Sequence, residues 1–322
     1  MRFWSPLEDL YAEIWSTTGF VNAHAHLDRA YTVTPEMMSL TKEHLHEKWR
    51  LVDKIKRERT VEDYAEGISM ALDLQKYHGV SHVCSFIDLD EVVGEKALDG
   101  ALLARQRTDR IKLILACQTL KGVLDRNALD LIEDRILDLD IIGSLPGADR
   151  GREEEHLDTV LELGKVYDKM VHVHVDQMNT PDEKETELLC RKTIEWGMEG
   201  KVVAVHSISL AAHPKAYRQE VYRMAQDAGM MFVSCPSAWI DHQRSELLMP
   251  FHNAVTPVDE LIDFGLTVAI GSDNIHDIYK PYSDGDMGTE LRFLLESCKI
   301  YDKETLKNIA VDGGLRVCGI IK

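Results

Sequence analysis

Short runs of aliphatic and β-branched residues alternate with longer segments of helical periodicity along most of the chain. Most of the runs are continuously apolar, which is typical of parallel strands that are buried on both faces. Eight such runs occur, at 20–24, 81–86, 111–116, 139–143, 171–175, 202–206, 230–235 and 267–271. Eight strand–helix units in one chain favour a (β/α)8 TIM barrel of the α/β class. An open α/β sheet is the alternative.

The segments between the runs place apolar residues on one face of a helix. In 61–78, Val61, Tyr64 and Ile68 share a face that follows Thr60, a candidate N-cap. Further helices are expected at 127–138, 153–168, 182–197, 215–228, 257–264, 286–298 and 303–313. The charged segment 29–60 is expected to contain its own helix and to lie over the mouth of the barrel as a lid.

Composition and charge narrow the classes of function. The chain has 322 residues, which we expect to form a single domain over 1–322, and 37 basic against 55 acidic side chains give a net charge of −18. Such an acidic chain argues against nucleic acid as a partner, because phosphate binding needs clustered Lys and Arg. No apolar run is long enough for a membrane span, and the first residues, MRFWSPLEDL, do not resemble a secretory signal.

The six cysteines are scattered without a C-x-x-C pair, so neither a zinc knuckle nor a disulfide framework is indicated. Reduced cysteines within apolar runs fit a reducing compartment. We therefore expect a cytoplasmic protein. The composition leaves open whether it forms a homo-oligomer.

The first apolar run ends in the sequence HAHLD, at residues 24–28. Side chains two positions apart in a strand point the same way, so His24 and His26 can present two imidazoles to one point. A divalent metal requires such a pair. The alternative is a pair of structural or surface histidines.

Three later runs end in residues of the same chemical kind. The fifth ends VHVHVDQ with His174, the sixth ends with His206, and Asp273 follows the eighth. In a barrel the carboxyl ends of all strands meet at one face, so these residues converge with His24 and His26. Imidazoles with one carboxylate suit a hydrolytic site that holds one divalent metal ion, Zn²⁺ or Fe²⁺.

These motifs resemble the amidohydrolase superfamily, and within it the cytosine-deaminase-like branch. The resemblance covers about residues 20–300 and includes the segments at 109–118, 141–149, 167–176 and 265–279. It implies that His24, His26, His174 and Asp273 bind the metal and that His206 lies beside the metal-bound water. It also implies that Gln118 and Tyr279 contact a bound ring, and that the substrate is a small nitrogen heterocycle.

The sequence departs from this branch at two positions. Cytosine-type deaminases carry a glutamate where this chain has Gln177, and a neutral amide has no proton to transfer near pH 7. Either Asp176 or Asp273 transfers the proton, or the substrate needs no ring protonation. Asn274 follows Asp273 where another acid is common. With Asn274 and Arg29 the chain resembles members of the branch that act on hydroxylated triazines, of the N-isopropylammelide type. Both residues could bind ring oxygens of such a substrate. Alternatively, Arg29 pairs with an acid of the adjoining loop.

The expected reaction is hydrolysis of a C–N bond, either deamination or amine or amide cleavage, by a metal-bound hydroxide. His206 and Asp273 are the expected catalytic residues, with Gln177 beside the substrate. A hydrolase of a lactone, ester or phosphoester, or a non-catalytic metal- or ligand-binding barrel, is the alternative. Members of this kind usually add a small β-sandwich, and we expect a barrel without it.

Other polar residues are expected to lie outside the metal site. We expect His172 to point away from His174 toward the outer helices, and His44 to be solvated. The loop after the seventh run carries Trp239, Asp241 and His242 and is a candidate for closing on a ligand.

Overall fold

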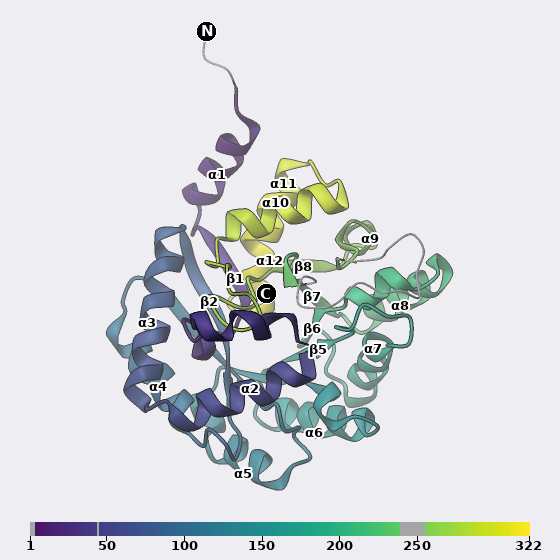
Figure 1. Cartoon of the computed structure of the whole chain (residues 1–322). Coiled ribbons are helices and arrows are strands. Elements are labelled where there is room, and N and C mark those ends of the chain that lie inside the picture. The colour runs from purple at the N-terminus through teal and green to yellow at the C-terminus, as the bar shows by residue number, and fades with distance from the viewer. Residues whose placement is uncertain (1–3, 44, 239–254) are drawn as a thin grey trace.

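Eight parallel strands form one sheet, in the order β1 to β8, in the computed structural model of the chain (Figure 1). The structure describes residues 4–43, 45–238 and 255–322. The strands are β1 (Phe20–Ala25), β2 (Val80–Asp88), β3 (Lys112–Gln118), β4 (Ile141–Ser144), β5 (Met170–Val175), β6 (Val202–His206), β7 (Met231–Ser234) and β8 (Thr267–Ile270). The predicted (β/α)8 barrel is confirmed, with each expected strand placed within a few residues. The extent of a single domain over 1–322 stays a prediction.

The barrel closes where the end of β8 meets β1. Ala25 pairs with Asp273 in a parallel bridge. The Asp273 amide donates to the His24 carbonyl at 3.0 Å, and the His26 amide donates to the Asp273 carbonyl at 2.8 Å. Gly271 permits this approach, because a Cβ at that position would lie 2.6 Å from the Cβ of His24. The residues that close the barrel are therefore the ones that carry the candidate chemistry.

Helices pack around the sheet. They are α1 (Pro6–Ser16), α2 (Leu45–Glu58), α3 (Val61–Tyr77), α4 (Lys96–Arg107), α5 (Arg126–Asp134), α6 (Glu153–Val166), α7 (Glu185–Trp196), α8 (Lys215–Asp227), α9 (Val258–Asp263), α10 (Met287–Cys298), α11 (Lys303–Ala310) and α12 (Asp312–Val317). Thr60 caps α3 as predicted, in a capping box with Asp63. The predicted helix at 303–313 is divided into α11 and α12.

Two helices, α1 and α4, were not among the predicted elements. The buried face of α4 consists largely of Ala and Gly, including Ala97, Gly100 and Ala101. A Cβ on Gly100 would lie 2.4 Å from the Cβ of Tyr64 in α3. The two helices thus pack too closely for large apolar side chains, so the hydrophobic pattern of α4 is weak.

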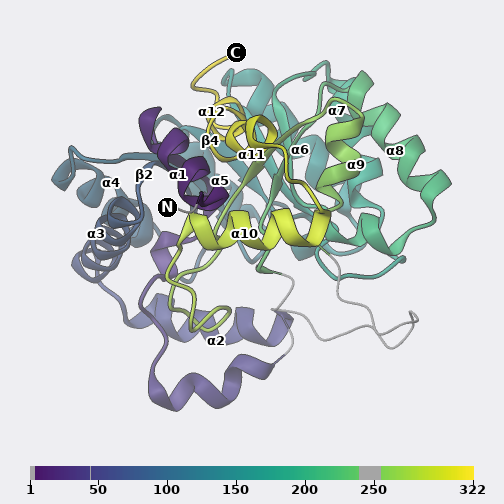
Figure 2. The same ribbon diagram turned by 90° about the horizontal axis from the view of Figure 1, so that it is seen from above.

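The connection between β1 and α3 forms a separate layer. It contains a 3-10 segment, Pro35–Lys42, and α2. In Figure 1 α2 crosses in front of the barrel, and in Figure 2 this connection lies along one side of the barrel body. Among the described residues, no helix has both the length and the apolar character that crossing a membrane requires.

Candidate metal centre

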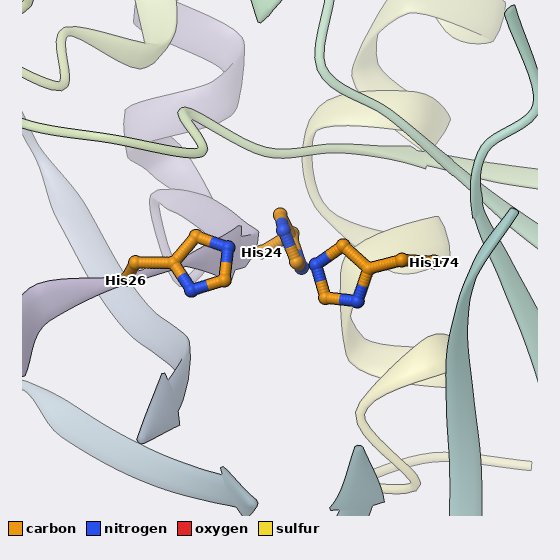
Figure 3. Close-up of side chains that lie close together, drawn as sticks. All are labelled: His24, His26 and His174. Carbon is orange, nitrogen blue, oxygen red and sulfur yellow. The ribbon is translucent and has the colours of Figure 1, made fainter. Parts of the chain in front are cut away.

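Four strands bring five of the predicted residues together at the carboxyl end of the barrel. His24 lies within β1 and His26 directly follows it, and their ring centroids are 4.9 Å apart. The His174 ring from β5 lies 4.7 Å from that of His24, so the three imidazoles face one another (Figure 3). His206, the last residue of β6, lies 5.3 Å from both His24 and His174. We call His24, His26, His174, His206 and Asp273 the floor of the site.

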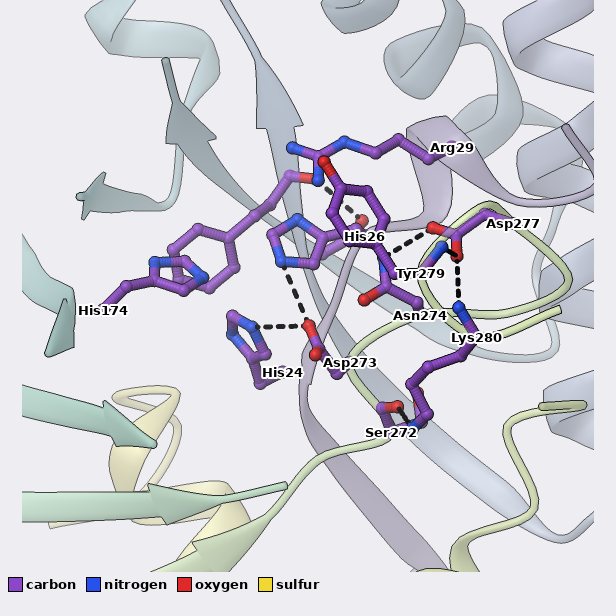
Figure 4. A network of polar contacts seen from close by, with 12 residues as sticks. His24, His26, Arg29, His174, Ser272, Asp273, Asn274, Asp277, Tyr279 and Lys280 are labelled. Carbon is purple, nitrogen blue, oxygen red and sulfur yellow. Dashed lines mark hydrogen bonds and ion pairs between the residues drawn. The ribbon is translucent and has the colours of Figure 1, made fainter. Parts of the chain in front are cut away.

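Asp273 brings the carboxylate to this cluster. Its Oδ1 lies 3.4 Å from Nε2 of His24 and 3.3 Å from Nε2 of His26 (Figure 4). All five floor residues are buried. The floor contains two groups of three residues whose potential ligand atoms lie within 4.8 Å of one another. One group is His24, His26 and His174, and the other is His24, His206 and Asp273.

Several buried nitrogens of the floor have no hydrogen-bond partner among the described residues: Nδ1 of His24, Nδ1 of His26 and Nε2 of His174. Buried polar atoms are normally hydrogen-bonded, so a cluster of exceptions needs an explanation. Imidazole nitrogens next to a carboxylate form a donor set that a divalent transition metal prefers. The floor residues therefore fit a metal ion.

Burial sets the charge of the imidazoles. It lowers the pKa of His24 and of His206 to about 4, and it also lowers the pKa of His26 and of His174. Burial alone would raise the pKa of Asp273, but hydrogen bonds with His24 and His26 hold it well below its usual range. Neutral imidazoles and an ionised carboxylate are the forms that bind metals.

The backbone is strained where three of these strands end. Asp176, His206 and Asp273 have φ of 54°, 76° and 62°, in the left-handed region that is uncommon for residues other than glycine. Such conformations cost about 1–3 kcal/mol each and occur preferentially at functional sites. The strain re-aims each side chain as its strand ends.

A cavity lies on the floor. The predicted substrate residues Arg29, Gln118, Gln177, Asn274 and Tyr279 all line it, together with His26, His174, His206 and Asp273. Gln118 is buried, and its Oε1 has no hydrogen-bond partner among the described residues. An amide oxygen in this position is available to accept a hydrogen bond from a ligand.

Helix α2 covers the cavity with Leu45 and Trp49, which we call the roof. We predicted a lid from this segment but did not single out these two side chains. The amphipathic sequence pattern of α2 is the signal from which these two side chains could have been identified. Leu145, Ile208 and Ala238 also line the cavity, and they were missed because isolated apolar residues after strands carry no chemical signal.

Arg29 both lines the cavity and pairs with an acid, so the two alternatives for this residue are combined. Its guanidinium contacts both carboxylate oxygens of Asp88, at 2.8 and 3.3 Å. Lys56 of α2 reaches the same carboxylate at 2.9 Å and Asp90 at 2.5 Å, and all four residues are buried. The helix that carries the roof is thus joined through Asp88 to Arg29, which lines the cavity.

Asp176 does not line the cavity. Its carboxylate accepts hydrogen bonds from the backbone amides of Glu185 and Thr186, at 2.7 and 3.2 Å, at the start of α7. Its positive φ turns the side chain toward this helix. The substrate-binding role of Asp176 therefore stays a prediction, and its carboxylate is engaged by α7 and not by the described cavity. Asn274 lines the cavity, but one of its amide hydrogens is donated to Asp277 at 2.5 Å.

The orientation predicted for His172 was wrong. Positions two apart in a strand share a face, and the His172 ring lies 6.2 Å from that of Phe86, which also packs against His174. His172 therefore lies inside the barrel beneath the floor, where its Nε2 contacts the Val317 carbonyl at 2.7 Å. The proposed loop residues Trp239, Asp241 and His242, and also His44, lie outside the described residues.

No protein-family model matches the chain. An uncharacterised protein of Haemophilus influenzae is 46% identical over 255 residues, which are 78% of this chain and 92% of that protein. The two proteins belong to one family. The N-isopropylammelide isopropyl amidohydrolase of Pseudomonas sp. (strain ADP) is 27% identical over 276 residues, which are 84% of this chain and 65% of that enzyme.

The fold matches a crystal structure of 5-methylcytosine deaminase from Klebsiella pneumoniae, liganded with 5-fluorocytosine. The TM-score is 0.86 at 24% sequence identity, and the match covers 92% of this chain and 74% of that one. In sequence the chain is similar to this amidohydrolase, and in fold it is similar to this deaminase. The resemblance to the amidohydrolase superfamily seen in the sequence is thereby confirmed. The five floor residues occupy the ends of β1, β5 and β6 and the turn after β8.

Proposed function

We propose that this protein is a member of the amidohydrolase superfamily and that it hydrolyses a C–N bond of a small nitrogen heterocycle with the help of one divalent metal ion, Zn²⁺ or Fe²⁺. The observation that supports this most is the floor, where three imidazoles with unpartnered buried nitrogens lie together and two of them, His24 and His26, contact the Asp273 carboxylate. The 27% identical relative is named as an isopropyl amidohydrolase, and the structural relative as a deaminase, so both act on such bonds.

In this proposal His24, His26, His174 and Asp273 hold the metal ion. A bound divalent ion would polarise a water molecule and lower its pKa toward about 7. His206 lines the cavity and is neutral because burial lowers its pKa to about 4, so it is able to accept a proton from water. Asp273 orients the water through its second carboxylate oxygen.

The reaction then exchanges a C–N bond for a C–O bond. Water oxygen adds to the ring carbon that carries the leaving nitrogen, and the proton accepted by His206 passes to that nitrogen as it departs as ammonia or an amine. Gln177 has no proton to transfer and serves as a hydrogen-bonding group. The other cavity residues, Arg29, Gln118 and Asn274, offer donors and acceptors for ring oxygens and ring N–H groups, and Tyr279 offers an aromatic face.

This set of polar groups favours an oxygenated ring over cytosine. Among the described residues that line the cavity, Asp273 is the one carboxylate, so the described lining offers no second acid to protonate a ring nitrogen. A ring that already carries carbonyl and N–H groups needs no such protonation. We therefore propose hydroxylated triazines and related cyclic ureides, with an amino or alkylamino substituent, as the substrate class.

The test is a screen of the zinc- and iron-loaded protein for release of ammonia or alkylamine from pyrimidines, triazines, pterins and cyclic ureas. We expect turnover of an oxygenated ring. We also expect His206→Asn to lose at least a factor of about 100 in kcat, the usual contribution of a general acid–base residue. In the same screen Gln177→Glu is expected to gain deamination of cytosine.

Three results would contradict the proposal. Bound metal without turnover of any C–N substrate would favour a binding barrel. Turnover of lactones or esters alone would favour the alternative that the protein is a hydrolase of C–O bonds. Full activity of His206→Asn would remove the proposed proton transfer.

A further inference from the structure

Two buried polar residues, Ser144 and His156, and the partly buried Asp149 connect the end of β4 to α6 and lie beside the floor. The Oγ of Ser144 lies 2.6 Å from Nε2 of His156, and Nδ1 of His156 lies 2.6 Å from Oδ2 of Asp149. Ser144 and His156 are 1% and 0% exposed. The proposed function uses none of these three residues, and the sequence analysis did not identify them.

The arrangement has the composition of a serine hydrolase triad, but Ser144 is not placed to attack a substrate. Its neighbour Gly143 occupies the inner face of β4, where a Cβ would lie 2.7 Å from Cε1 of Phe86. Because side chains alternate along a strand, Ser144 points outward toward α6. The cavity is lined by Leu145 instead.

The backbone of Ser144 contacts the floor directly. Its carbonyl oxygen lies 3.0 Å from Nδ1 of His174. A carbonyl only accepts hydrogen bonds, so the hydrogen of the neutral imidazole is on Nδ1 and the lone pair is on Nε2. Nε2 of His174 is the nitrogen without a hydrogen-bond partner among the described residues. This contact therefore selects the tautomer that can bind a metal.

The other side of the arrangement is anchored in the loop after β3. Oδ2 of Asp149 accepts the amide of Leu124 at 3.3 Å. A Cβ on Gly122 would lie 2.2 Å from Oδ1 of Asp149, so only glycine leaves space for this carboxylate. Because a carboxylate accepts, His156 donates through Nδ1 and accepts the Ser144 hydroxyl through Nε2. Burial lowers the pKa of His156, which is consistent with this neutral form.

We propose that His156 is a positioning residue of the metal centre. Together with Asp149 it fixes Ser144, and the carbonyl of Ser144 fixes the tautomer and direction of the His174 ring. This inference rests on the proposed function, because it requires His174 to be a metal ligand. Groups that orient metal-bound imidazoles are general in metalloproteins, and their loss typically lowers metal affinity 10- to 100-fold.

The test is a zinc titration of the metal-free full chain against a chelator of known affinity. His156→Leu breaks both contacts, and we expect it to bind zinc roughly 10- to 100-fold more weakly. Ser144→Ala keeps the carbonyl and removes the hydroxyl, so we expect a smaller loss in the same direction. His156→Gln can both donate and accept, and is expected to recover most of the affinity.

A matched control is His213→Gln. His213 is buried, and its Nε2 contacts the backbone carbonyl of Glu183 at 2.7 Å. Within the described part of the chain, no hydrogen bond or ring contact joins it to the floor. We expect unchanged zinc affinity. The visible spectrum of the Co²⁺-loaded protein gives a second readout, which should change for His156→Leu and not for His213→Gln.

The outcomes separate this inference from the proposed function. If the wild-type chain binds no zinc, the proposed metal site fails. If the wild type binds zinc and both His156→Leu and Ser144→Ala bind it equally tightly, the positioning role is overturned. An equal loss in His213→Gln would also overturn it, because the effect would then be general. If His156→Leu fails to fold, the zinc affinity of Ser144→Ala decides whether the positioning role holds.

Discussion

The floor and the roof enclose one cavity but are built in different ways. Floor residues lie in strands or in the turns that directly follow them, and main-chain hydrogen bonds between the His24–His26 segment and Asp273 connect the two sides of the barrel closure. The roof residues Leu45 and Trp49 lie on one helix. Side-chain pairs hold that helix to the barrel: Lys56 with Asp88 and Asp90, and Asp53 with Lys121 at 2.7 Å.

This difference implies a division of roles. The contacts that close the barrel fix His24, His26 and Asp273, and the pairing of β5 with β4 and β6 fixes His174. The roof is held by these ion pairs and by a small apolar cluster in which Leu45 and Val52 of α2 pack with Leu120. An element that is docked by side chains alone can open locally at a much lower free energy than global unfolding. We therefore expect a rigid floor that holds the ion and a roof that admits substrate.

The largest expected effect is at the floor, from His174→Gln. We expect metal content to fall from about one ion per chain to nearly none, because the variant removes one of the proposed ligands. His172→Gln is the matched control, since it also changes a buried histidine of β5. It should keep its metal. Measuring zinc by mass spectrometry after dialysis checks both, and equal metal content in the two variants would contradict the account.

A smaller effect is expected at the roof, from Lys56→Met. Removing one partner of a buried ion pair typically costs about 3–5 kcal/mol, and here the loss falls on the contact between α2 and the barrel. We expect faster amide hydrogen exchange across α2 with metal content unchanged. Lys54→Met, on the same helix but 79% exposed, should change neither. Loss of metal from Lys56→Met alone would show that floor and roof are not independent.

The smallest effect concerns pH. Burial alone would raise the pKa of Asp88, but Arg29 and Lys56 hold it well below its usual range; burial alone would lower the pKa of Lys56, but Asp88 and Asp90 raise it. The stabilisation that the Asp88 charge gives to the contact between α2 and the barrel is present above the ordinary carboxyl pKa of about 4. It is lost as the pH falls toward the pKa of Asp88 in the folded protein. The stabilisation that the Lys56 charge gives to the same contact is present below the ordinary lysine pKa of about 10.4. It is lost as the pH rises through the pKa of Lys56 in the folded protein.

It follows that the charges of Asp88 and Lys56 should be constant between about pH 5 and pH 9. The neighbouring group that titrates within this range is Asp28, which accepts the Asp88 amide at 3.0 Å and whose pKa is raised to about 7 by burial and by the Asp88 charge. Protection factors of the α2 amides, corrected for intrinsic exchange rates, provide the measurement. A tenfold fall in protection within this range would show that a different titrating group holds the roof.

The sequence predicted the floor well because its signals are local. The alternation of apolar runs identified the strands, and each floor residue lies at the end of one, where the topology alone brings it to the common face. The capping box at Thr60 and Asp63 is a similar short-range signal. Residues whose role depends only on position along a strand are thus predictable from one sequence.

Other parts of the site depend on contacts between distant segments and could not be predicted in this way. Lys56 and Asp88 meet across 32 positions of the chain, and nothing near either residue marks the pair. The link between Ser144 and His156 needs the docking of α6 on β4. The contact of Asp176 with α7 was not predicted, because the positive φ that redirects its side chain leaves no trace in the residue types around it.

The most direct test of the central claim is anomalous diffraction at the zinc absorption edge, from crystals of the zinc-loaded protein. The account predicts one strong peak at about 2.0–2.2 Å from ligand atoms of His24, His26, His174 and Asp273. A structure in which the floor imidazoles bond only to water or to one another, with zinc absent or bound elsewhere, would contradict it.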